Sequence, residues 1–68
     1  MNDRDLMNLC FSFLIDGGTE KTPMTAEDAA YTLKQWQEEG GELAEDTKDL
    51  SPTRFADAWN TVLNCLQH

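Results

Sequence analysis

Two glycine pairs divide this chain of 68 residues into segments of helix length. Gly17-Gly18 and Gly40-Gly41 each follow a run of apolar residues at helical spacing, and glycine after such a run is a strong signal for a helix end. No alternating apolar and polar pattern of strand length appears. The sequence therefore predicts an all-α fold, a small three-helix bundle with helices at about 3–16, 26–39 and 52–67. We expect residues 1–68 to form a single helical domain.

The residues before each predicted helix suit a helix N-terminus. Asn2 or Asp3 can cap the first helix, and Thr25 opens a variant of the capping box at the second. Ser51 before Pro52 is the clearest start, because serine accepts a hydrogen bond from the first turn and proline is pre-set for the first helical position. The segment between the second and third helices is expected to be a loop with at most a short turn.

Each predicted helix has an apolar face, and these faces are expected to form one core. Trp36, Phe55 and Trp59 should meet there. Both cysteines are placed on apolar faces, where a free thiol behaves as a small hydrophobic group. The expected core residues are Leu6, Leu9, Cys10, Phe13, Leu14, Ala26, Ala29, Ala30, Leu33, Trp36, Phe55, Ala58, Trp59, Val62, Leu63 and Leu66.

Acidic residues dominate the charge of the chain. Thirteen Asp and Glu stand against five Lys and Arg, for a net charge of −8, which disfavours direct binding to nucleic acid and favours basic surfaces. The densest acidic stretch lies at the end of the second predicted helix and after it, where the helix dipole disfavours anions. It is either a solvated loop or a surface for a basic partner. This candidate acidic surface consists of Glu38, Glu39, Glu42, Glu45, Asp46 and Asp49.

The first predicted helix carries more apolar residues than one core contact needs. Met7, Phe11 and Ile15 form a second ridge at i, i+4 and i+8. Either this helix is the most buried one, or the ridge is exposed and binds a partner or a second copy of the chain. We expect the interface. Tyr31, which lies off the apolar face of the second helix, is a candidate rim contact.

Catalytic and metal-binding arrangements are weak in this sequence. The single histidine, His68, is the last residue, so no nucleophile has a well-placed base and we expect no enzymatic activity. Cys10, Cys65 and His68 lack the paired spacing of zinc sites. Residues 16–27 have the length of a calcium loop, but Lys21 stands where that loop needs glycine. We therefore expect no metal and no cofactor.

Taken together, these features predict a small acidic module that binds another protein through the apolar ridge and the acidic surface. A different class of function is an acidic mimic of nucleic acid that inhibits a nucleic-acid-binding protein, as small anti-restriction or anti-CRISPR proteins of phages and mobile elements do. A structural homodimer is a third. The longest apolar segment, 6–15, is too short to span a bilayer and no signal peptide is evident, so we expect no membrane contact and a cytoplasmic location.

Overall fold

The computed structural model describes residues 1–16 and 22–67, and this part of the chain holds four helices and no strand. The helices are α1 (Asp3–Asp16), α2 (Ala26–Glu39), α3 (Glu42–Thr47) and α4 (Pro52–Gln67). The all-α class is confirmed, and the three long helices have the predicted bounds. The predicted count of three helices is wrong within the described residues, because the segment expected to be a loop forms α3.

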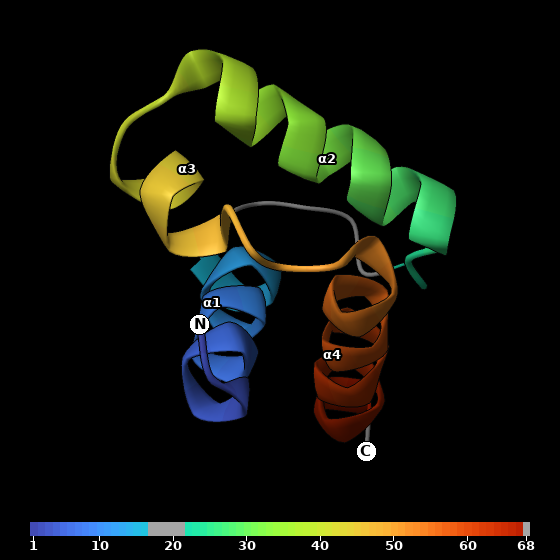
Figure 1. Cartoon of the computed structure of the whole chain (residues 1–68). Helices are drawn as coiled ribbons and strands as arrows, with labels where there is room; N and C mark the ends of the chain where they lie inside the picture. Colours follow the sequence, from blue (N-terminus) through green and yellow to red (C-terminus); the bar gives the residue numbers. More distant parts are fainter. Residues whose placement is uncertain (17–21, 68) are drawn as a thin grey trace.

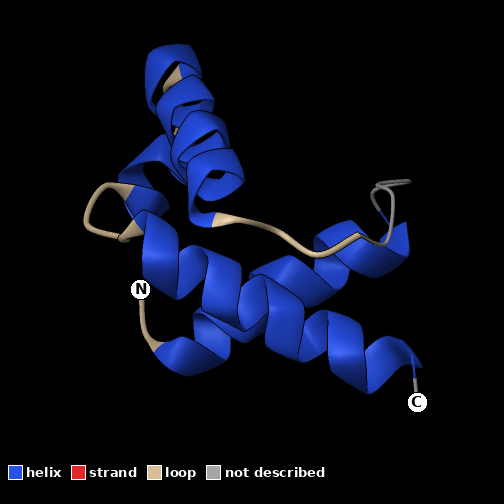
Figure 2. Cartoon of the chain, turned by 90° about the vertical axis from the view of Figure 1, so that its right-hand side faces the viewer, coloured by secondary structure: helices blue, strands red, loops and turns tan. Residues whose placement is uncertain are grey.

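Helices α1 and α4 pack against each other, and α2 lies across them at the top of Figure 1. Figure 2 shows that α1 and α4 cross one another instead of running alongside. The short helix α3 packs on α2 and leads the chain back to the start of α4. The backbones of α1 and α2 stay apart, so large side chains must fill the space between them.

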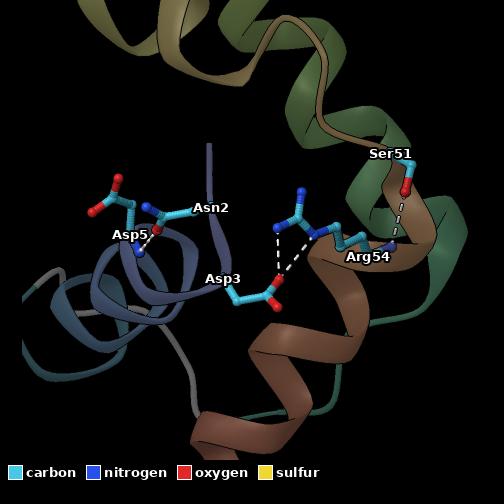
Figure 3. A network of polar contacts seen from close by, with 5 residues as sticks. All are labelled: Asn2, Asp3, Asp5, Ser51 and Arg54. Atoms are coloured by element: carbon cyan, nitrogen blue, oxygen red, sulfur yellow. Dashed lines mark hydrogen bonds and ion pairs between the residues drawn. The ribbon is translucent and has the colours of Figure 1, made fainter.

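Hydrogen bonds fix the starts of the three long helices where the sequence predicts them. The Asn2 carboxamide oxygen accepts from the Asp5 amide at 2.8 Å, and the Ser51 hydroxyl accepts from the Arg54 amide at 3.2 Å (Figure 3). At α2, the full capping box of Thr25 and Asp28 is present. Each cap satisfies an amide that has no partner within its helix, which is why these residues set the boundaries.

Helix α3 is held by its neighbours, since six residues are too few for a stable isolated helix. The Gln37 side-chain amide of α2 donates to the Ala44 carbonyl at 2.7 Å and to the Thr47 hydroxyl at 3.4 Å. The Thr47 hydroxyl, which is buried, donates in turn to the Leu43 carbonyl at 2.7 Å. This network gives Thr47 a partner inside the protein and fixes α3 against α2.

A chain of aromatic rings connects α1, α2 and α4 through the core. Phe13 stacks on Trp36 with ring centroids 5.5 Å apart, Trp36 lies 5.4 Å from Phe55, and Phe55 meets Trp59 edge to face at 6.3 Å. The predicted meeting of Trp36, Phe55 and Trp59 is confirmed. Aromatic pairs add stabilisation beyond the area they bury.

Several residues expected in the core lie elsewhere. Leu9 of α1 is only half-buried. Ala26 and Ala30 of α2 are exposed, because α2 turns a narrower face inward than its sequence suggests. Cys65 is also exposed, which corrects its placement on an apolar face. The other expected residues are buried or pack on the core.

The segment before α2 is attached to α4 by polar contacts. The Asn60 side chain accepts from the Met24 amide at 2.8 Å and donates to the Met24 carbonyl at 2.9 Å. The indole N–H of Trp59 donates to the Thr22 carbonyl at 3.0 Å. These bonds pair backbone groups that would otherwise lack partners, and they determine how α2 approaches α4.

Candidate functional site

The six residues of the candidate acidic surface are all exposed and lie on three consecutive segments. Glu38 and Glu39 end α2, three more are on α3, and Asp49 follows α3. At the end of α2 the helix dipole disfavours the two glutamates, as expected. Glu42 and Glu45, however, lie in the first turn of α3, where the dipole favours anions. The helix dipole of α3 therefore accounts for Glu42 and Glu45 without a binding partner.

One cation lies within this stretch. The Lys48 ammonium pairs with the Glu45 carboxylate at 2.9 Å. Among residues 1–16 and 22–67, Asp46 and Asp49 form no ion pair. The surface around α3 therefore keeps a net negative charge that a basic partner could neutralise.

A groove of about 690 Å³ separates α1 from the α3 region. Asp5 of α1 lines it together with Glu45, Asp46 and Asp49, so acidic residues from two parts of the chain far apart in sequence border the same hollow. The presence of Asp5 at this groove does not follow from the sequence pattern, because it depends on how α1 packs. The groove is lined by Met1, Asp5, Asn8, Leu9, Ser12, Glu45, Asp46, Lys48 and Asp49.

Packing buries part of the predicted apolar ridge of α1 and leaves the rest exposed. Phe11 and Ile15 are 48% and 47% exposed, whereas Met7 is partly buried and packs on the core. Leu9, expected in the core, lies in the groove instead. The outer side of α1 thus carries two exposed apolar side chains near its C-terminal end and one apolar residue in the acidic groove.

Tyr31, the candidate rim residue, is 66% exposed on α2. Its hydroxyl oxygen accepts a hydrogen bond from the Gln35 side-chain amide at 2.8 Å. Tyr31 does not line the acidic groove. The structure therefore leaves it as a single exposed aromatic residue on α2.

The two cysteines lie in opposite environments. Cys10 is fully buried, and desolvation raises the pKa of its thiol to about 11. Cys65 is exposed on α4.

The described residues contain no group of three side chains placed to hold a metal ion. His68, and residues 17–21 of the segment with calcium-loop length, lie outside the described part of the chain.

In the ranges 1–16 and 22–67, every helix is too short or too polar to cross a membrane.

Comparisons with protein-family models, curated proteins and solved structures found no match. A function for this chain must therefore be argued from its own surface.

Proposed function

We propose that this chain is a non-enzymatic protein-binding module whose acidic groove binds a basic segment of a partner protein. The observation that carries the proposal is the convergence of Asp5 with Glu45, Asp46 and Asp49 around one groove. Charges arranged in this way steer a basic partner and fix its orientation more than they add affinity.

Apolar residues beside the carboxylates supply the remaining contact. Leu9 lies within the groove, and Phe11 and Ile15 are exposed farther along the same helix. Phe11 and Ile15 do not line the groove, so the partner would extend from the carboxylates over the adjacent side of α1 to reach them. Apolar anchors within a polar surround are the usual source of binding energy in protein interfaces.

These apolar residues favour an interface with apolar contacts over one that mimics nucleic acid through charge alone. A mimic needs exposed carboxylates alone, whereas Phe11 and Ile15 would contribute nothing to it. The two functions differ in their dependence on salt. Binding through carboxylates alone should weaken steeply as salt rises, and binding with apolar anchors should keep part of its strength.

The test is quantitative capture of partners from the source cell with matched variants. The groove variant combines Asp46→Asn with Asp49→Asn, and the control combines Glu27→Gln with Asp57→Asn, which are exposed on α2 and α4. Both remove two charges. We expect the control to retain the partner and the groove variant to lose it. Equal capture by both variants would contradict the proposal, and a captured protein that nucleic acid displaces would support mimicry.

A further inference from the structure

A second groove, of about 470 Å³, lies on another part of the surface and shares no lining residue with the acidic groove. Its volume falls in the range of small-molecule sites, roughly 300–1,000 Å³. Side chains of α1, α2 and α4 meet around it. The apolar part of its lining is Phe13, Pro23, Met24, Trp36 and Trp59.

Contacts within the chain already hold the aromatic residues of this groove in place. Trp36 stacks on Phe13 and packs on Phe55, and the indole N–H of Trp59 is occupied by the Thr22 carbonyl. Trp36 therefore has two ring neighbours within the core, and the Trp59 donor is already paired. A flat apolar group that packs against ring edges matches this lining.

The polar residues of the groove are Thr22, before α2, and Asp28 and Thr32 on α2. Asp28, Thr32 and Trp36 follow one another at intervals of four residues, so they share one side of the helix. From Asp28 to Trp36 the helix rises by about 12 Å. The groove thus has a carboxylate near one end and an indole near the other.

The carboxylate of Asp28 has capacity for a further partner. One of its oxygens, Oδ2, accepts a hydrogen bond from the Thr25 amide at 3.4 Å, and the residue is exposed. Among the described residues it forms no ion pair. A net charge of −8 repels anionic ligands from the whole surface.

From this arrangement we infer that the groove binds small amphipathic cations, molecules with a flat apolar group at one end and a basic amine at the other. The apolar group lies against Trp36 and Phe13, and the amine pairs with Asp28. This inference does not depend on the proposed protein-binding function, because it uses other residues.

The experiment compares three probes that share a phenyl group on a short alkyl chain and differ in the charge of the polar end group: 4-phenylbutylamine, 4-phenylbutanol and 4-phenylbutyrate. Binding to the full chain is followed by nuclear magnetic resonance, with the indole N–H signals of Trp36 and Trp59 as reporters. We expect saturable shifts with the amine, binding about two- to fivefold tighter than the alcohol, as for an exposed ion pair. The carboxylate should bind most weakly.

Asp28→Asn should remove the advantage of the amine over the alcohol while keeping the affinity for the alcohol. Asparagine retains an oxygen that can accept from the Thr25 amide, so α2 should keep its cap. Asp57→Asn, which removes the same charge from outside the groove, should leave the order of the probes unchanged. The inference is overturned if no probe shifts the indole signals, or if amine and carboxylate bind the native chain equally.

Discussion

Arg54 in the first turn of α4 donates two hydrogen bonds to Asp3 in the first turn of α1. Its Nη2 atom lies 2.6 Å and its Nε atom 3.2 Å from the same carboxylate oxygen, across 51 positions of sequence (Figure 3). The pair links the N-terminal ends of the two helices.

This ion pair should nevertheless contribute little to stability. The Arg54 and Asp3 side chains are 42% and 88% exposed, so water and salt screen their attraction. A double-mutant cycle with Asp3→Asn and Arg54→Gln, measured by urea unfolding, should give a coupling below about 1 kcal/mol that shrinks as salt increases. A larger coupling, insensitive to salt, would mean that the pair is shielded from solvent.

Two phenylalanines should differ sharply in their effect on stability. Phe55 is 1% exposed and lies between Trp36 and Trp59, whereas Phe11 is 48% exposed. Phe55→Ala should lower the free energy of unfolding by about 3–5 kcal/mol, since it leaves a cavity in the core. Phe11→Ala should change it by less than about 0.5 kcal/mol. Similar losses in thermal or urea unfolding would place Phe11 in the core as well.

Two serines make a matched pair for the helix cap of α4. Ser51→Ala removes the acceptor of the Arg54 amide and should cost about 1 kcal/mol. Ser12 is exposed inside α1, where alanine is the better helix former, so Ser12→Ala should leave stability unchanged or raise it by about 0.5 kcal/mol. Urea unfolding of both variants checks the difference, and equal effects would contradict the capping role.

The glycines between α2 and α3 are required by their backbone angles. Gly40 has φ 72° and ψ −168°, and Gly41 has φ 92° and ψ −165°, a region that L-residues other than glycine rarely adopt. A Cβ atom at either position would meet nothing within 4 Å, so the cost of substitution is backbone strain alone.

Gly40→Ala should therefore destabilise the chain by about 1–3 kcal/mol. A chemically synthesised chain with D-alanine at position 40 is the control, because D-residues favour positive φ. It should be at least as stable as the native chain in thermal unfolding. Equal destabilisation by both alanines would show that space, not chirality, limits this position.

The two cysteines predict a difference in reactivity and a pH dependence of stability. At pH 8, a thiol reagent should modify Cys65 in the folded chain and reach Cys10 only after unfolding.

Burial raises the pKa of Cys10 from 9.0 to about 11, so the folded state holds its proton more tightly than the unfolded state. Its contribution to stability is complete below pH 9 and is lost as pH rises from about 9 towards 11.

The pH dependence is measured by urea unfolding between pH 8 and pH 11. Cys10→Ala should lose the part of the slope that comes from this thiol, although the substitution itself lowers stability. Cys65→Ala is the matched control and should keep the slope. An identical pH profile for all three chains would show that Cys10 ionises alike in the folded and unfolded states.

The bounds of the long helices were predictable from sequence because they depend on local chemistry. Ser51 and Pro52 start α4, and Thr25 starts α2, through bonds made within one helical turn. The positive φ angles of Gly40 and Gly41, which glycine adopts readily, end α2 in the same local way. The acidic stretch was predictable too, since charged side chains seldom lie far from solvent.

Tertiary packing alone decided which neighbour each helix face would meet. The apolar pattern predicts Leu9 in the core and Met7 on the surface, but in the folded chain Met7 packs on the core and Leu9 lines the groove with residues of α3. Helix α3 forms because Gln37 and Thr47 hold it, which no pattern within its six residues predicts. Both grooves exist only where separate helices approach, because a hollow depends on relative orientations that local sequence does not encode.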